Sequence, residues 1–461
     1  MNNIASTTTP ASTNGRRRGR AASFDPDARI GIIGAGAAGL TVARALKKKG
    51  FRRVTVLERE SRVGGKCNTV VHEGRSYELG ATVLSPRCPN AHALARELGI
   101  KAVANADRSF PGVNWRRSAF LPPLSLDVDS GRATLWSPVL RAESLQSVAA
   151  GSLRLGIETF RARDTRNPGH SGIPGEMCLP FTDWLRQAGI SGGARLVVDP
   201  LVTPLGYGYL TETPAAYVLK YLSIAVAPPF RELLDGGYQG LWEAAARELD
   251  VRLDVKVRSV KRAEQVVVET DRGDWTFDAL VLTSPLDEAL SFLDATADEA
   301  EVAAKVRYVD YRVVIASASG LPDNRYVMLP KHFDAPTRGE VLFWQRRWLE
   351  SDAYTFYAYG REGSPLDETT ARVRETVRRA GGTLTNVHFA KKWRYFPHVS
   401  PEDLAHGFFE RMEGMQGARH TYYAGELLSM ATVETVMSQA HDLVNRHFAV
   451  SRESSRASLG R

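Results

Sequence analysis

The chain has 461 residues, of which 43% are hydrophobic and 24% are charged, and its formal net charge is +8. These values are ordinary for a globular protein, and the length is sufficient for two domains. The sequence has no run of about 18 apolar residues, which argues against a membrane-spanning helix. Its three cysteines, Cys67, Cys88 and Cys178, lack the spacing of a metal site. We therefore expect reduced thiols, no bound metal and a cytoplasmic location.

Both ends of the chain have the composition of disordered segments. Residues 1–27 are rich in Ser, Thr, Asn and Gly, include the basic run from Arg16 to Arg20, and contain no apolar core of a secretory signal. A basic arm can bind nucleic acid or acidic lipid, but a solvated tail is the simpler interpretation. We expect no nucleic-acid partner, at most peripheral membrane contact, and a disordered tail over residues 450–461.

A complete pattern for binding a dinucleotide follows the leader. An apolar strand from residue 28 enters the turn Gly34-Ala35-Gly36-Ala37-Ala38-Gly39, and a helical run then leads to a strand that ends at Glu58. Gly34 permits the sharp turn, Gly36 lets a pyrophosphate approach the backbone, and Gly39 lets the helix pack on the sheet. The helix N-terminus attracts phosphate, and Glu58 would accept ribose hydroxyls but repel a 2′-phosphate. The segment predicts a Rossmann-like domain and disfavours NADP.

Two further segments favour FAD over NAD. Arg62-Val63-Gly64-Gly65 resembles the flavoprotein pattern in which an acid, an arginine and a glycine pair surround FAD. Near the C-terminus, Ala424-Gly425-Glu426 ends a strand and precedes an amphipathic helix over about 433–448. This element resembles the last part of the amine-oxidase-like FAD fold, in which the helix start donates an N–H group toward the flavin.

The middle of the chain alternates between two kinds of segment. Helical stretches mixed with Pro, Arg and aromatic residues give way to a strand-rich part, and no second strand–GxGxxG–helix unit is present. Electrons are therefore expected to pass to oxygen, to another acceptor, or back to the substrate. We predict an α/β fold with an FAD-binding domain and a mixed α+β substrate domain with a helical cap. The FAD-binding domain comprises residues 28–105, 232–292 and 412–449, and the substrate domain comprises residues 106–231 and 293–411.

Longer segments resemble the FAD-dependent polyunsaturated fatty acid double-bond isomerases of propionibacteria, within the amine-oxidase-like flavoproteins. They are Leu179-Pro180-Phe181, Gly206-Tyr207-Gly208-Tyr209, residues 214–222, Tyr395-Phe396-Pro397-His398-Val399-Ser400 and residues 413–417. The resemblance extends over nearly all of residues 28–448. It implies FAD as cofactor and a small, apolar, unsaturated substrate.

The motifs and the resemblance together indicate which residues form the site. In such folds the turn at Gly80 approaches the flavin, and the strand around Val257 meets the adenine through its backbone. The cofactor-binding candidates are Gly34, Ala35, Gly36, Ala38, Gly39, Glu58, Arg59, Gly64, Gly65, Lys66, Gly80, Ala81, Thr82, Val257, Gly425, Glu426 and Val433. The substrate-pocket candidates are Arg108, Leu205, Tyr207, Tyr209, Tyr395 and Phe396, whose aromatic members would line an apolar channel. No catalytic side chain is predicted.

The chemistry that the resemblance implies has no net redox change. A hydride would leave the carbon between two double bonds for flavin N5 and return at an end carbon, which yields a conjugated diene. The protein would supply position, dryness and charge placement.

Two departures from the family pattern fall where the substrate would lie. The arginine that engages the carboxylate corresponds to Arg108 or to Ser109, and Leu205 replaces a phenylalanine. Linoleate is therefore one candidate among unsaturated acyl chains.

Other flavin-dependent readings stay open. An amine oxidase using oxygen is one alternative, although Thr432 stands where such oxidases usually carry an aromatic ring. A polyene desaturase with an external acceptor is another, and a non-enzymatic flavin-binding module is a third.

Overall fold

A central parallel sheet carries the predicted dinucleotide motif. The computed structural model describes residues 22–82, 84–104, 124–127, 132–135, 145–163, 172–190, 192–225, 231–233, 236–321 and 326–451. The sheet has the order β10-β3-β2-β14-β20, with all neighbouring strands parallel. Its strands are β2 (Arg29–Ile33), β3 (Arg53–Leu57), β10 (Asp250–Arg252), β14 (Ala279–Leu282) and β20 (Thr421–Tyr423). Strand order shows that segments from both ends of the chain build one sheet.

Helices cover this sheet because its middle strands are apolar on both faces. Ile30, Ile32 and Val281 are fully buried, as is typical of parallel sheets. Helix α1 (Ala37–Lys49) packs against α14 (Val433–His447), and α14 also contacts α2 (Pro89–Glu97). Helix α8 (Gly237–Ala246) lies against α1 as well.

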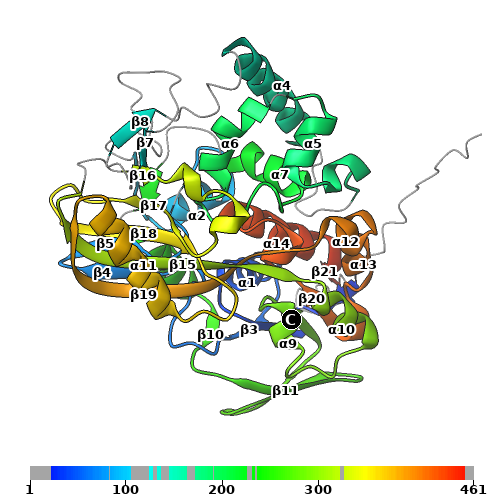
Figure 1. Ribbon diagram of the computed structural model, residues 1–461. Helices are drawn as coiled ribbons and strands as arrows, with labels where there is room; N and C mark the ends of the chain where they lie inside the picture. Colours follow the sequence, from blue (N-terminus) through cyan, green and yellow to red (C-terminus); the bar gives the residue numbers. More distant parts are fainter. Residues whose placement is uncertain are drawn as a thin grey trace, which may run out of the picture.

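A second, larger sheet lies apart from the parallel one. Its seven strands follow the order β19-β15-β18-β17-β16-β7-β8. They are β7 (Leu124–Asp127), β8 (Arg132–Leu135), β15 (Arg307–Ser319), β16 (Tyr326–Met328), β17 (Val341–Gln345), β18 (Ala353–Tyr359) and β19 (Thr383–His398). Helix α11 (Leu366–Arg379) packs on this sheet, and the helices α4 (Leu145–Arg163), α5 (Phe181–Gln187), α6 (Arg195–Val202) and α7 (Ala215–Ala225) gather together above it (Figure 1).

Smaller elements complete the structure. The other strands are β1 (Ala22–Phe24), β4 (Thr69–His72), β5 (Arg75–Glu78), β6 (Ala102–Ala104), β9 (Arg231–Leu233), β11 (Val257–Arg262), β12 (Val266–Thr270), β13 (Gly273–Phe277) and β21 (Phe448–Val450). The other α-helices are α9 (Leu286–Ala289), α10 (Ala297–Ala304), α12 (Pro401–Ala405) and α13 (Phe408–Gly414). Short 3₁₀ turns are η1 (Gly175–Cys178), η2 (Gly192–Ala194), η3 (Pro330–His332), η4 (Ala335–Thr337), η5 (Ala418–His420) and η6 (Glu426–Leu428).

The architecture confirms the predicted α/β fold and corrects two details. Residues 22–27 are ordered rather than part of a disordered leader, because β1 pairs in parallel with β21 and Phe24 stacks on Phe448 at 5.3 Å between ring centroids. Residue 450 likewise belongs to β21 rather than to a disordered tail. Within the described residues, none of the helices is both long and apolar enough to cross a membrane. The three cysteines are unpaired thiols, as expected.

Candidate functional site

The glycine turn between β2 and α1 has the geometry that its sequence predicts. Gly34 has a φ of +106°, a value that L side chains rarely adopt. A Cβ on Gly39 would lie 1.9 Å from the Gly34 carbonyl oxygen, so only glycine allows the helix to start this close to the strand. Gly36 precedes the helix, and Ala38 within its first turn is buried.

Glu58 closes this turn from the tip of β3. One of its carboxylate oxygens accepts a hydrogen bond from the Ala35 amide at 2.7 Å, and the other accepts one from the Glu60 amide at 2.9 Å. The side chain is buried at 8% exposure. Arg59, in contrast, is 63% exposed and pairs with Glu288 on α9 at 3.0 Å.

Arg62 rather than Arg59 supports the glycine pair. Its guanidinium donates to the carbonyls of Gly65, Val63 and Cys67 at 2.8–3.3 Å. The supported turn packs directly on the first one, because a Cβ on Gly65 would lie 3.2 Å from Gly36 Cα. The two glycine motifs, which are separate in sequence, therefore form one continuous backbone surface.

The segment around Gly80 lies beside Lys66. A Cβ on Gly80 would be 1.7 Å from the Lys66 carbonyl oxygen, and the Ala81 amide donates to the same oxygen at 3.2 Å. Thr82 follows, partly buried. These backbone contacts bring the third predicted segment to the edge of the glycine surface.

The C-terminal element meets the same surface. The Lys66 ammonium pairs with Glu426 at 2.6 Å, and a Cβ on Gly425, whose φ is +126°, would lie 3.8 Å from Ala38 Cβ. Helix α14 begins at Val433, where the Thr432 hydroxyl accepts a hydrogen bond from the amide of residue 435 at 3.2 Å. The first and last motifs of the chain thus lie side by side.

Val257 sits further along this edge. It begins β11, and Val255, two positions earlier, donates its amide to the Glu58 carbonyl at 2.8 Å. The segment that precedes Val257 therefore lies beside the backbone of Glu58, the predicted ribose-binding residue.

Three of the predicted pocket residues form one aromatic group, in which Tyr207 and Phe396 are buried and Tyr395 is partly buried. The rings of Tyr395 and Phe396 lie 5.7 and 5.5 Å from that of Tyr207. Both tyrosine hydroxyls donate to the Ala431 carbonyl at 2.9 Å, immediately before α14. Burial raises the pKa of both phenols well above the usual value, so they stay neutral. These hydrogen bonds link the aromatic group to the segment before α14, and Lys66 lies 5.6 Å from the centre of the Tyr395 ring.

Phe396 is held in an unusual conformation. Its φ is +48° although it is neither glycine nor exposed. Non-glycine residues rarely adopt such values, which persist only where the surroundings enforce them and which are frequent at functional sites. Nothing in the sequence signals this strain.

The remaining pocket candidates lie elsewhere. Tyr209 packs against Tyr359 and under the Arg338 guanidinium, at 5.1 and 4.9 Å, and not in the Tyr207 group. Leu205 is partly buried at the edge of the main core. Arg108 and Ser109 lie outside the described residues.

Two further aromatic residues contact this group and were not predicted. The ring of Tyr221 lies 4.0 Å from that of Tyr207, tilted by 35°, and Tyr311 lies 5.5 Å from Tyr395 and donates to the Pro204 carbonyl. Alternation along the strand that carries Tyr311 predicts that residue's burial, but no sequence signal predicts which aromatic faces which.

The converging residues fit a dinucleotide. The nearest heavy atom to a Cβ on Gly36 would be 3.9 Å away, so the space above this glycine is open, whereas the space at Gly34 and Gly39 is filled. The buried Ser284 hydroxyl, which follows β14 beside the turn, has no hydrogen-bond partner in the part of the chain that the structure describes. An open glycine cradle with a carboxylate behind it matches a pyrophosphate and its ribose.

Comparisons with known proteins agree with this fit. The sequence matches the family described as flavin containing amine oxidoreductase over residues 37–344. The crystal structure of a CLA-producing fatty acid isomerase from P. acnes superposes with a TM-score of 0.80 at 29% identity, covering 92% of this chain and 99% of that one.

Two further relatives carry other activities in their names. Beta-cyclopiazonate dehydrogenase of Aspergillus flavus is 23% identical over 424 residues, which is 86% of this chain and 87% of the relative. Cyclohexylamine oxidase from Brevibacterium oxydans has the same fold, with a TM-score of 0.65 at 16% identity, 95% coverage of this chain and 100% of that one. The family match includes Gly39, Glu58 and the strands of the second sheet up to Trp344, and members of the family use FAD. The chain therefore belongs to the flavin containing amine oxidoreductase family and is an FAD-dependent enzyme.

Proposed function

We propose that this protein is an FAD-dependent isomerase that moves a double bond in an unsaturated fatty-acyl substrate. The observation that carries the proposal is the likeness to the fatty acid isomerase from P. acnes, with a TM-score of 0.80 and 29% identity over 92% of this chain. The largely buried group of Tyr207, Tyr395 and Phe396 supports it, because an apolar acyl chain needs an apolar wall that excludes water.

The cofactor-binding residues would divide the FAD between them. The pyrophosphate would lie over Gly36 at the start of α1, and Glu58 would receive the ribose hydroxyls. The Lys66–Glu426 pair and the start of α14 at Val433 would border the flavin ring. In this arrangement residues 28–105, 232–292 and 412–449 serve the cofactor, and residues 106–231 and 293–411 serve the substrate.

The FAD, when bound, supplies the acceptor and donor of a hydride. The substrate would lose a hydride from the carbon between two double bonds and regain one at an end of the five-carbon unit, so atoms and electrons balance. Aromatic ring faces stabilise nearby positive charge, and the neutral phenols of Tyr207 and Tyr395 place their rings without adding a formal charge. The chain's own contribution would be to orient the acyl chain and exclude water.

An amine oxidase is the second candidate. The relatives that carry oxidase and dehydrogenase names support it, and Tyr395 offers one aromatic wall for an amine. Thr432, however, leaves the opposite position without a ring.

A substrate panel separates these functions. We would incubate the purified holoenzyme with linoleic acid, with shorter and longer polyunsaturated acids, and with primary and polyamine substrates, while recording oxygen uptake and ultraviolet absorbance. A conjugated diene formed from an acid without oxygen uptake supports the isomerase. Oxygen uptake with an amine, and no diene from any acid, would replace this proposal by the amine oxidase.

A further inference from the structure

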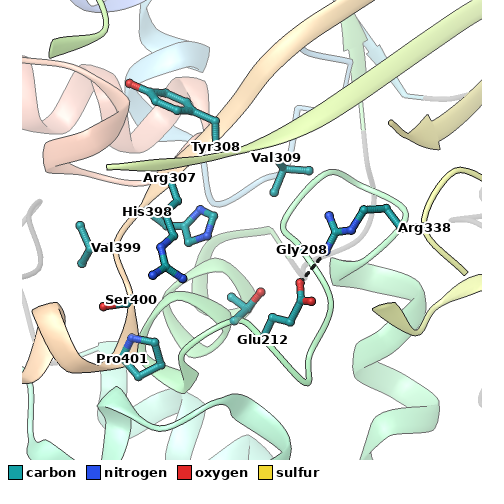
Figure 2. Close-up of a pocket in the computed structure, with 11 residues that line it drawn as sticks. Gly208, Glu212, Arg307, Tyr308, Val309, Arg338, His398, Val399, Ser400 and Pro401 are labelled. Atoms are coloured by element: carbon teal, nitrogen blue, oxygen red, sulfur yellow. Dashed lines mark hydrogen bonds and ion pairs between the residues drawn. The ribbon is translucent and has the colours of Figure 1, made fainter. Parts of the chain in front are cut away.

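A cavity of about 320 Å³ lies at the end of β19, where His398 lines it two positions after Phe396 of the aromatic group. It is bounded by the loop from Gly208 to Thr213, by the start of β15, by the end of β19 with the start of α12, and by Arg338 after η4 (Figure 2). This volume is in the range of small-molecule sites.

The cavity is distinct from the predicted cofactor and acyl-chain sites. Phe396 contacts both the aromatic group and the cavity lining, since its ring meets that of Tyr207 edge-on and stacks on His398 at 4.9 Å. His398 lines the cavity, whereas none of the predicted cofactor-binding residues does.

One wall of the cavity is positively charged. Arg307 and His398 are directly opposed in the antiparallel pair β15–β19, so their side chains emerge on the same face, and Figure 2 shows them together. Among the residues that the structure describes, no carboxylate pairs with Arg307.

The facing wall is balanced in charge. Glu212 and Arg338 form an ion pair at 2.7 Å, which Figure 2 marks with a dashed line. The carboxylate of Glu212 is thereby engaged, and the cavity as a whole retains the positive charge of Arg307.

Part of the lining is apolar. Val309, Val399 and Pro401 lie beside the charged wall. A ligand with one oxyanion and a short hydrocarbon body would match both parts of the lining, because the anion is attracted to the guanidinium and the body leaves the apolar surface dry.

We propose that this cavity is a binding site for a small carboxylate with a short apolar body, held by Arg307 and His398. The site is independent of the proposed isomerase activity, so either proposal can fail while the other stands.

The protonation of His398 makes the binding pH-dependent. Its Nδ1 donates to the Phe396 carbonyl at 2.8 Å, which leaves Nε2 for a ligand or a proton. Burial lowers the pKa of His398 below its usual value; the carbonyl and Glu212 oppose this, and Arg307 and Arg338 reinforce it. A bound carboxylate favours the imidazolium, so binding is expected to tighten as the pH falls through the pKa of His398.

Calorimetric titration of the holoenzyme with hexanoate, and separately with inorganic phosphate, tests the proposal. We expect hexanoate to bind at least tenfold more tightly than phosphate. Arg307→Gln should weaken hexanoate binding at least tenfold, and Glu212→Gln should strengthen it severalfold because Arg338 is then released toward the ligand. Arg258→Gln is the matched control, since Arg258 is an exposed arginine on β11 away from the cavity. His398→Asn should remove the pH dependence.

Each contrary result overturns a stated part of the proposal. Equal hexanoate affinity in the wild type, Arg307→Gln and Arg258→Gln proteins would rule out the site, as would no binding at millimolar concentration. Phosphate binding as tight as hexanoate binding would rule out the apolar part of the ligand class. If the Arg307→Gln variant loses its FAD or does not fold, the Glu212→Gln variant tests the site instead. Hexanoate binding that is not strengthened in Glu212→Gln would then rule out the site.

Discussion

Lys66 and Glu426 form an ion pair at 2.6 Å although 360 positions separate them in the chain. Lys66 follows the second glycine motif near the N-terminus, and Glu426 follows the last strand of the parallel sheet. Their side chains are about one-quarter exposed, at 26% and 24%. The pair therefore links the N-terminal and C-terminal segments of the predicted cofactor site at a position that water reaches only in part.

Breaking this pair from one side is expected to cost stability. Lys66→Met or Glu426→Gln leaves one charge without its partner, and each should lower the free energy of unfolding by about 1–3 kcal/mol. The double variant should lose less than the sum of the two. Urea unfolding of the four proteins measures this coupling.

An exposed pair provides the control for this measurement. Lys261 and Glu269 also approach to 2.7 Å, but Lys261 is 67% exposed, and Lys261→Met should leave the stability nearly unchanged because water screens the pair. Additive effects of the Lys66 and Glu426 substitutions would show that the two charges do not interact.

Substitution by alanine should affect FAD binding at Gly36 and protein stability at Gly39. The φ of Gly36 is −77° and the space at its Cβ position is open to 3.9 Å, so Gly36→Ala should fold while weakening FAD binding at least tenfold. Gly39→Ala would place its methyl group 1.9 Å from the Gly34 oxygen and should destabilise the whole protein. Equilibrium titration with FAD and thermal unfolding distinguish the two effects. Unchanged FAD affinity in Gly36→Ala would place the pyrophosphate elsewhere.

The ring of Tyr207 is expected to matter more than its hydroxyl. Tyr207→Phe removes a neutral hydrogen bond to Ala431, which is worth about 1 kcal/mol, so diene formation should fall less than about tenfold. Tyr207→Ala opens a cavity in the aromatic wall and should reduce the rate by more than about a hundredfold. Initial rates of diene formation at saturating substrate measure both.

Tyr354→Phe is the matched control for the hydroxyl. Tyr354 is as buried as Tyr207 but belongs to a separate hydrophobic cluster with α11. Its substitution should leave the rate unchanged. If Tyr207→Ala retains wild-type rates, the aromatic group does not line the acyl-chain site.

Acid should weaken the region around Glu299 in a defined pH range. Burial by itself raises the pKa of Glu299, but hydrogen bonds from Arg262 and Tyr423 outweigh it and lower the pKa to about 2. A carboxyl group with a lowered pKa stabilises the folded state above its unfolded pKa of 4.5, and this stabilisation is lost as the pH falls toward 2. The full contribution is about 3 kcal/mol.

Glu299→Gln isolates this contribution from those of other acids. The variant should be less stable than the wild type at pH 6 and approach it as the pH falls through the range from 4.5 to 2. Urea unfolding across this range gives the difference. A constant difference at every pH would mean that the Glu299 carboxyl does not titrate with folding.

The local motifs were predictable because each depends on neighbouring residues. Gly34, Gly39 and Glu58 lie where the strand–turn–helix pattern requires them, since backbone conformation and close packing leave only those residue types. The grouping of Tyr207 with Tyr395 followed from the resemblance rather than from any local signal.

Long-range geometry could not be predicted in the same way. Tyr209 is two residues from Tyr207 but contacts Tyr359 instead, because Gly208 with its φ of +79° reverses the chain between them. Arg59 pairs with Glu288, and Phe24 with Phe448, through contacts that join distant parts of the chain. Such contacts arise only when the whole chain has folded, so they cannot be predicted from composition or from the spacing of residues.

Anaerobic turnover of linoleic acid with two deuterium atoms on the carbon between its double bonds tests the central claim most directly. Mass spectrometry would locate the deuterium in the product, and visible absorbance would report the flavin. We expect a conjugated diene of unchanged mass in which one deuterium has moved to an end carbon of the five-carbon unit, with the flavin oxidised at the end. A product lighter by one deuterium and one hydrogen, formed together with reduced flavin, would contradict the isomerase and indicate a desaturase or oxidase.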